Sequence, residues 1–321
     1  MSQPPVNDQS IDISVIVPYK TFSNTKEMLT SLEKQDYTGR FETILVEGGN
    51  IAQARNHGIS LAQGEFVAFT DSDCNPRSDW LTKMSNYLTL FTSAGGIGGI
   101  GDTLENSDIL SQSIDAVYDS YLGSLGSPSL AKTRNVSKVE AISSHNSIFH
   151  KTVLDLVGGY NEIYILNEDT ELCKRITECD YDLIFVPDSI VYHRRKETYR
   201  EFTSKFFNWG VSRARAILTS PKMIDLKILT LFAGFISIIL LAMLNPKGSV
   251  FLTIIYLGVI LLNSLYYGAI RKMPHLVPNM IILYLLQHLS YALGLLMGLL
   301  KGKYKESTEN PEFRTIIKRI S

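Results

Sequence analysis

Two carboxylates stand in the short segment Asp71-Ser72-Asp73, directly after an apolar, β-rich stretch that ends at Thr70. Carboxylate oxygens are the ligands that hard cations such as Mg²⁺ and Mn²⁺ prefer, and a cation held in this way can also bind a diphosphate. A solvated polar turn has the same composition, so the pair alone leaves both interpretations open. His193 follows another β-rich stretch, residues 189–192, and is a candidate third ligand. We therefore predict a divalent-metal site formed by Asp71, Asp73 and His193.

A second acidic segment, Asn167-Glu168-Asp169-Thr170-Glu171, stands before residues with helical spacing. Acidic side chains in the first turn of a helix interact favourably with the helix dipole, and Asn167 or Asp169 can cap that helix. This structural explanation competes with a catalytic one. A carboxylate beside a hydroxyl group can act as a general base, because it removes the proton as the oxygen attacks.

The elements that must position these side chains are strands that alternate with helices. This alternation predicts an α/β fold with a mostly parallel sheet flanked by helices. Ligands of such sheets bind beyond the carboxyl ends of the strands, so Pro18, Glu47 and Asp71 should line one crevice. The expected elements are strands at 13–18, 41–46 and 65–70 and helices at 24–35, 51–63 and 80–91.

Three further segments have less decisive patterns. The glycine-rich residues 95–101 predict a turn and a tight strand rather than a phosphate loop, because no Gly-Lys-Ser/Thr follows them. Residues 103–138 are polar and are a candidate active-site loop. The basic run Arg194-Arg195-Lys196 could contact phosphates or lipid headgroups, or could simply be solvated.

Composition excludes some classes of protein. The chain has 321 residues and a formal net charge of −1, so no global field favours nucleic acid as a partner. Its three cysteines form no disulfide framework. Residues 1–11 are polar and are expected to be flexible, without the apolar run of a signal peptide, which predicts that the domain after them stays in the cytoplasm.

The last third of the chain predicts a membrane region. Three apolar runs each approach the roughly 20 residues that a helix needs to cross a bilayer. Buried core helices are the alternative. Three crossings would place the basic tail outside the cell, whereas the positive-inside rule favours the cytoplasm, and the sequence leaves this conflict open. The expected segments are an amphipathic interfacial one at 198–225, a transmembrane region at 226–300 with runs at 226–244, 249–270 and 277–300, and a basic tail at 301–321.

Taken in order, the motifs resemble the inverting glycosyltransferases of family 2, which have the GT-A fold. The resemblance covers about residues 12–215, and 12–197 would be the catalytic domain. The C-terminal apolar runs look like those of a subgroup that resembles succinoglycan-type and archaeal N-glycan-type membrane transferases. The matching segments are Ser14-Val15-Ile16-Val17-Pro18-Tyr19, Ala54-Arg55-Asn56-His57-Gly58, Asp71-Ser72-Asp73-Cys74, Gly158-Gly159-Tyr160, Glu168-Asp169-Thr170-Glu171-Leu172 and Val186-Pro187 leading to His193.

The resemblance implies roles for individual residues. Asp169 would be the catalytic base and Glu168 would shape the acceptor site, while Asp73 would bind Mg²⁺ or Mn²⁺. The residues implied for the nucleotide-sugar are Pro18, Tyr19, Glu47, Arg55, Asp71 and His145. The family commonly has Asp followed by a Gly-Ser-Thr-Asp-like segment after the second strand, where this chain has Glu47-Gly48-Gly49-Asn50, so the nucleotide base stays open.

The sequence therefore predicts an integral membrane glycosyltransferase with its catalytic domain on the cytoplasmic face. A Gln-x-x-Arg-Trp motif, typical of processive synthases, does not occur in the sequence, which favours addition of a single sugar. The expected partners are a nucleotide-sugar donor and a lipid-linked saccharide acceptor. The alternatives are a polyprenyl-phosphate sugar synthase, a nucleotidyltransferase, and a non-catalytic membrane-anchored binding protein.

Overall fold

The computed structural model describes residues 11–103, 108–124, 135–193, 197–305 and 311–320. The chain separates into two compact units. An α/β unit contains Met1–Asp102, Thr133–Arg194 and Ser307–Ser321, and a helical unit contains Thr103–Lys132 and Arg195–Glu306. The α/β unit therefore gains a segment from the very end of the chain, and the helical unit gains one from within the first half.

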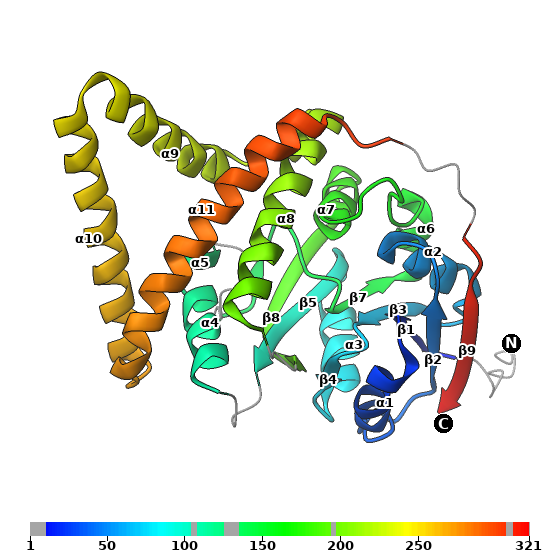
Figure 1. The fold of residues 1–321 in the computed structure, drawn as a ribbon. Helices are drawn as coiled ribbons and strands as arrows, with labels where there is room; N and C mark the ends of the chain where they lie inside the picture. The colour runs from blue at the N-terminus through cyan, green and yellow to red at the C-terminus, as the bar shows by residue number, and fades with distance from the viewer. Residues whose placement is uncertain (1–10, 104–107, 125–134, 194–196, 306–310, 321) are drawn as a thin grey trace, which may run out of the picture. The chain divides into compact units, whose positions relative to one another are not determined.

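One sheet forms the centre of the α/β unit, with the strand order β4-β8-β5-β7-β3-β1-β2-β9 and with β6 paired to β8 (Figure 1). Among the pairings described, only those of β1 with β2 and with β3 are parallel. The sheet is thus mixed and not mostly parallel as predicted, because strand-like residue patterns do not encode strand direction. The strands are β1 Ile13–Tyr19, β2 Phe41–Glu47, β3 Phe66–Thr70, β4 Cys74–Pro76, β5 Ala94–Thr103, β6 Ser137–Lys138, β7 Asn146–His150, β8 Asp182–His193 and β9 Arg314–Ile320.

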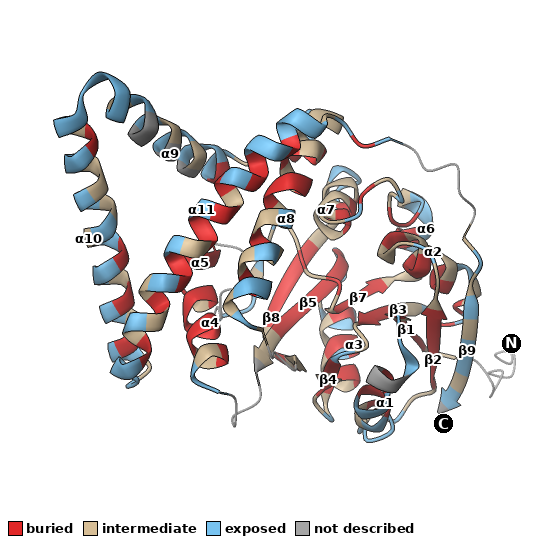
Figure 2. Ribbon diagram, viewed as in Figure 1, coloured by how far each residue is buried: buried red, intermediate tan, exposed pale blue. Residues whose placement is uncertain are grey.

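Helices cover both faces of this sheet, as the alternation of buried residues along β1 requires. Val15 and Val17 pack in one apolar cluster with α1 and α3. Ile16 packs in the other with α2, α6 and α7. Figure 2 shows the central strands as buried. The helices are α1 Lys26–Leu32, α2 Ile51–Leu61, α3 Trp80–Leu90, α6 Lys151–Val157 and α7 Glu168–Glu178, with a short 3₁₀ turn, η1, at Phe22–Thr25.

Local signals explain where the helices that serve the site begin. Asn50 accepts a hydrogen bond from the Gln53 backbone N–H, and the Gln53 side chain bonds back to the Asn50 backbone, which is a capping box for α2. The helix expected at 24–35 is shorter in the structure, because the 3₁₀ turn η1 runs to Thr25 and α1 begins at Lys26. At α7, Asn167 occupies the cap position with φ 68° but makes no side-chain cap bond.

The tail contains a strand that the sequence analysis did not predict. β9 lies antiparallel along β2, with Arg314 opposite Glu47 and Ile320 opposite Phe41. It is the edge strand of the sheet in Figure 1, and its described side chains are exposed or half-buried. Arg319 bonds to Gln63 Oε1 at 3.1 Å, which ties the far end of β9 to the residues that follow α2.

The helical unit contains the apolar runs. The part of 103–138 that the structure describes includes two helices, α4 and α5, rather than only a loop, and residues 104–107 and 125–134 lie outside the described ranges. Two helical segments are long and apolar enough to cross a membrane, Pro246–Ile270 and Pro274–Lys301. An ion pair joins Arg271 to Asp119 of α4. The helices are α4 Ile109–Asp119, α5 Tyr121–Ser124, α8 Tyr199–Thr219, α9 Leu226–Leu244, α10 Pro246–Ile270 and α11 Val277–Lys301, with 3₁₀ turns at Pro221–Met223 and Pro274–Leu276.

Candidate active site

The carboxyl ends of β1, β2 and β3 lie at one edge of the sheet, as the sequence predicts for ligand-binding residues. Tyr19 at the end of β1 is paired in register with Glu47 at the end of β2, and Pro18 is paired with Val46. Burial raises the pKa of Tyr19, and the nearby Glu47 carboxylate raises it further. The Tyr19 phenol therefore stays neutral and can both donate and accept hydrogen bonds at this edge.

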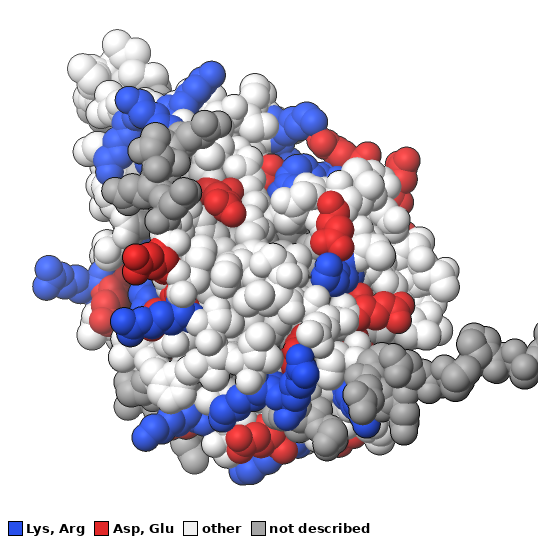
Figure 3. All heavy atoms as spheres, turned by 90° about the vertical axis from the view of Figure 1, so that its right-hand side faces the viewer, with Lys and Arg blue, Asp and Glu red and all other residues white. Residues whose placement is uncertain are grey.

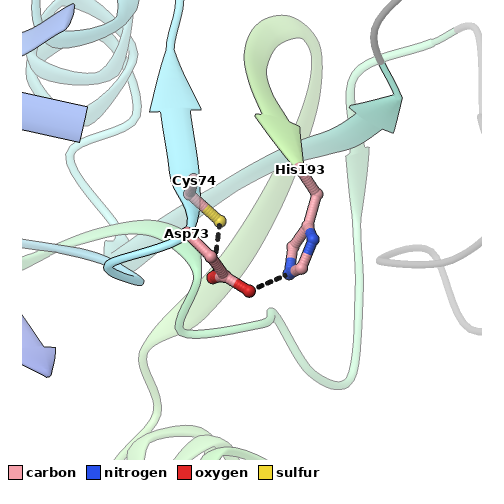
Figure 4. Close-up of side chains that lie close together, drawn as sticks. All are labelled: Asp73, Cys74 and His193. Atoms are coloured by element: carbon pink, nitrogen blue, oxygen red, sulfur yellow. Dashed lines mark hydrogen bonds and ion pairs between the residues drawn. The ribbon is translucent and has the colours of Figure 1, made fainter. Parts of the chain in front are cut away.

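Asp73, Cys74 and His193 form a cluster at the ends of β4 and β8 (Figure 4). The antiparallel pairing of β4 with β8 places Cys74 opposite His193. His193 Nε2 lies 3.5 Å from Asp73 Oδ2, and one ligand atom from each of the three residues lies within 4.8 Å of the others. In Figure 4 the Asp73 carboxylate lies between the thiol and the imidazole ring.

The donor atoms of this cluster suit a hard divalent cation. Asp73 offers carboxylate oxygens and is 52% exposed, so a diphosphate can approach it, while His193 offers an imidazole nitrogen. Cys74 is buried, and burial raises the pKa of its thiol, with Asp71 and Asp73 adding to the effect. A neutral thiol is a poor ligand, so Asp73 and His193 are the two residues here that fit Mg²⁺ or Mn²⁺.

Asp71, which the sequence analysis placed in the metal site, contacts Arg55 in the structure. Its carboxylate accepts from Arg55 Nη2 at 3.2 Å, and Arg55 Nη1 donates to Glu168 Oε1 at 2.7 Å. The guanidinium is therefore a bridge between the end of β3 and the start of α7. Arg55 is 2% exposed, and its guanidinium lies 5.3 Å from the ring centre of Tyr160. Residues from α2, β3 and α7 are thus held around one buried charge.

Glu168 and Asp169 stand side by side in different environments. Burial raises the pKa of Glu168 to about 7, and the neighbouring Asp169 carboxylate raises it while Arg55 opposes the shift. Asp169 is half-buried, and its Oδ1 accepts from the Thr170 backbone N–H at 2.7 Å. Glu168 therefore bonds to Arg55, whereas Asp169 has the more open carboxylate.

We expect the stability of the protein to fall as pH rises through the titration of Glu168. The pKa of Glu168 is about 7 in the folded chain, above its usual value of 4.5. The folded protein therefore binds this proton more tightly than the unfolded chain does. Stabilisation from this group is complete below 4.5 and is lost as pH rises through 7. Over the full shift the linkage amounts to roughly 3–4 kcal/mol.

Unfolding by urea at pH 5 and pH 8 measures this effect, and Glu168→Gln is the reference because it cannot titrate. The wild type should lose more stability than the variant between these two pH values. A difference between the two proteins that stays constant with pH would contradict the assignment.

His145 is held beside the metal candidates. Its Nδ1 bonds to Ser143 Oγ at 2.6 Å, and its ring centre lies 6.3 Å from that of His193. Gly101 of β5 makes room for it, because a Cβ at position 101 would lie 2.5 Å from His145 Nε2. The structure therefore brings His145 near His193, while Arg194, Arg195 and Lys196 lie outside the described residues.

Sequence reasoning assigned no role to two residues that support the site. Asn56 holds both backbone polar groups of Tyr160, through Nδ2 to the carbonyl at 2.8 Å and Oδ1 to the N–H at 2.7 Å. The Tyr160 hydroxyl bonds to Ser144 at 2.8 Å. The segments Arg55-Asn56 and Gly159-Tyr160 were both noticed as motifs, but only the fold shows that they contact each other.

A mixed sheet covered by helices, with acids and a histidine at one edge, is a GT-A-like arrangement. A mannosyltransferase of Pyrobaculum calidifontis, solved in complex with GDP-Man and Mn²⁺, shares this fold with a TM-score of 0.54 at 16% identity, over 87% of each chain. The model of glycosyl transferase family 2 matches residues 14–154. The chain therefore carries a glycosyltransferase domain of family 2, and the predicted GT-A-like fold class is confirmed.

Curated relatives support the same family. The pre-mycofactocin glycosyltransferase of Mycobacterium tuberculosis is 26% identical over 241 residues, which cover 68% of this chain and 50% of that protein. Glycosyltransferase AglE of Haloferax volcanii is 26% identical over 228 residues, which cover 62% of this chain and 71% of that protein. The chain thus spans half the length of the Mycobacterium relative.

Proposed function

We propose that this protein transfers a single sugar, with inversion, from a nucleotide-sugar to a lipid-linked saccharide at the cytoplasmic face of a membrane, in the assembly of a cell-surface polysaccharide or glycan. The observation that carries the proposal is the Arg55 bridge, which gathers Asp71 and the start of α7 around one cation. This bridge fixes the backbone on which Asp169 stands. A binding protein has no need of a half-buried carboxylate in this position.

The reaction is a single displacement at the anomeric carbon. Asp169 takes the proton of the acceptor hydroxyl while that oxygen forms a bond to the anomeric carbon. The bond from the anomeric carbon to the diphosphate breaks on the opposite side, and the nucleoside diphosphate leaves with the electron pair. Asp73 and His193 would hold a divalent ion, which when bound neutralises charge on the leaving diphosphate. Pro18, Tyr19 and Glu47 bind the nucleoside.

Two features of the helical unit support a lipid-linked acceptor. A groove of about 470 Å³ runs between α8 and α11 and is lined mainly by apolar surface, with Tyr199, Arg200 and Leu293 among its residues. The exposed Arg200 cation suits a phosphate, and the apolar wall suits a lipid chain. The two membrane-length helices of the same unit would keep such an acceptor close to the enzyme. A polyprenyl phosphate acceptor would need no base, so the placement of Asp169 favours a sugar hydroxyl.

Donor turnover tests this function and includes a prediction for the metal site. The full chain in lipid, with Mn²⁺ or Mg²⁺, is offered UDP- and GDP-sugars together with a membrane lipid extract, and released diphosphate is measured. We expect turnover with one donor. We expect Asp73→Asn to weaken metal-dependent donor binding by about 10-fold or more, since a charged ligand of the ion is lost.

Asp180→Asn is the matched control for Asp73→Asn. Asp180 is exposed in a turn with φ 63°, a conformation that Asn also adopts readily, so the same chemical change should leave binding unaltered. Unaltered metal dependence in Asp73→Asn would remove Asp73 from the metal site. If no donor yields released diphosphate, a nucleotidyltransferase or a non-catalytic protein would be favoured instead.

A further inference from the structure

The amino-terminal end of β9 lies at the ligand-binding edge of the sheet. β1 and β2 are parallel and end there at Tyr19 and Glu47. β9 is antiparallel to β2, so its first residue, Arg314, is the one paired with Glu47. A segment that follows the last helix thus carries a cation to the end of the sheet where a nucleotide is expected.

Side-chain contacts hold this end of β9 in place. The Phe313 ring stacks on His57 of α2, with 4.3 Å between ring centres and 12° between planes, and Thr315 Oγ1 lies 3.1 Å from His57 Nε2. Gly48 permits the approach, since it has φ +118° and a Cβ there would lie 2.2 Å from the Glu312 carbonyl oxygen. The turn after β2 and the residues before β9 are therefore built to fit each other.

Alternation along β9 directs Arg314 away from His57. Phe313 and Thr315 both contact His57 on the α2 side of the sheet, so Arg314 between them belongs to the opposite face. Tyr19 packs in the apolar cluster of that face. The positive charge of Arg314 lowers the pKa of Tyr19 against the larger effects of burial and Glu47.

The face that carries β9 does not present one sign of charge. Lys and Arg side chains stand among Asp and Glu side chains there, as Figure 3 shows. A general attraction for anions therefore does not explain the position of Arg314. The register that places Arg314 opposite Glu47 brings one cation and one carboxylate to this end of the sheet, which suits a ligand that offers both an acceptor and a donor.

We propose that Arg314 and Glu47 together read the base of the donor nucleotide, and that this base has a keto oxygen beside a ring N–H, as uracil and guanine do. The guanidinium donates to the keto oxygen and the carboxylate accepts from the ring N–H. Cytosine and adenine have no ring N–H on that edge, so they leave the Glu47 carboxylate without a donor from the ring. The inference rests on the proposed function, since it assigns the base of the nucleotide-sugar.

Calorimetric titration of the full chain with UDP, GDP, CDP and ADP, in the presence of Mn²⁺, tests the assignment. The wild type should bind UDP or GDP at least about 10-fold more tightly than CDP and ADP, because charge-assisted hydrogen bonds are made only to the keto base. Arg314→Ala should weaken binding of the preferred nucleotide about 10-fold and reduce the preference. Lys318→Ala is the matched control, because Lys318 is a cation of the same strand near its far end, and its partly exposed pairing with Glu33 at 3.9 Å contributes little.

Several outcomes would overturn the inference. An Arg314→Ala protein that keeps the full base preference would remove Arg314 from the base site. An equal loss for all four nucleotides would place the guanidinium on the diphosphate, and a wild type with no base preference would exclude base reading altogether. Arg314→Gln, which retains side-chain length, gives the same readings if Arg314→Ala loses β9. Failure of the wild type to bind any nucleotide would instead contradict the proposed function itself.

Discussion

Replacing Asp169 by Asn should reduce turnover by about 10²- to 10⁴-fold while donor binding stays close to that of the wild type. The amide is nearly the same size as the carboxylate but cannot accept the proton of the acceptor hydroxyl. Its side-chain oxygen can still accept the Thr170 backbone N–H, so the start of α7 should keep its structure. Diphosphate release measures turnover, and calorimetry with the donor measures binding.

Glu178→Gln is the matched control for this experiment. Glu178 is an exposed acid in the last turn of the same helix, so the substitution makes the same loss of charge away from the site. We expect it to leave turnover within about two-fold of the wild type. If Asp169→Asn and Glu178→Gln have equal and small effects, Asp169 is a helix-terminus acid and not the base. If Asp169→Asn abolishes donor binding as well, the residue supports the donor site instead.

Loss of the Arg55 cation should be the most destabilising single change at the site. In Arg55→Ala the carboxylates of Glu168 and Asp71 lose the positive charge that compensates them. Breaking a buried ion pair in this way costs roughly 3–5 kcal/mol. Arg55→Lys should recover only part of this. One ammonium group cannot reproduce the fork in which Nη1 lies 2.7 Å from Glu168 and Nη2 lies 3.2 Å from Asp71.

Urea unfolding followed by the fluorescence of Trp80 measures this loss, because Trp80 is fully buried in the α/β unit. Trp209 of the helical unit is replaced by Phe in every protein so that Trp80 alone reports. Lys151→Ala is the control, since the Lys151–Asp155 pair is a partly exposed i,i+4 pair that contributes at most about 1 kcal/mol. A loss in Arg55→Ala no larger than that in Lys151→Ala would show that the bridge does not hold the unit together.

The first half of the sheet could be predicted because its strands have strong local patterns. Residues 13–18, 41–46 and 65–70 correspond to β1, β2 and β3, and the turn after β2 ends with an Asn that caps α2. Their parallel pairing follows from the helices between them. The later strands pair antiparallel, and nothing in their residue pattern distinguishes the two directions.

Site residues could be selected from sequence, but their partners could not. Asp71 and Asp73 were taken together as metal ligands because they stand close in the chain. In the structure Asp71 contacts Arg55, whereas Asp73 lies beside His193. This division depends on the pairing of β4 with β8, which joins segments more than a hundred residues apart and leaves no local signal.

β9 shows the same limit more clearly. Its residues were read as a basic tail because Arg314, Lys318 and Arg319 stand close together. The strand exists because β2 offers an open edge, and because His57, Gly48 and Gln63 provide contacts along it. Each of these partners lies in the first quarter of the chain, so the tail alone carries too little information to predict the pairing.

If the helical unit spans a membrane, the return of β9 to β2 fixes whether the number of crossings is odd or even. Paired strands lie about 4.8 Å apart, whereas the hydrocarbon core of a bilayer is about 30 Å thick, so β9 and β2 must share one side of the membrane. The chain that leaves the α/β unit after β8 must therefore cross an even number of times before residue 314. The two segments with the length and composition to cross, Pro246–Ile270 and Pro274–Lys301, would then form one outward and one returning passage. In that arrangement Lys301, Lys303 and Lys305 would follow the returning helix on the side of the α/β unit, where the positive-inside rule favours basic residues.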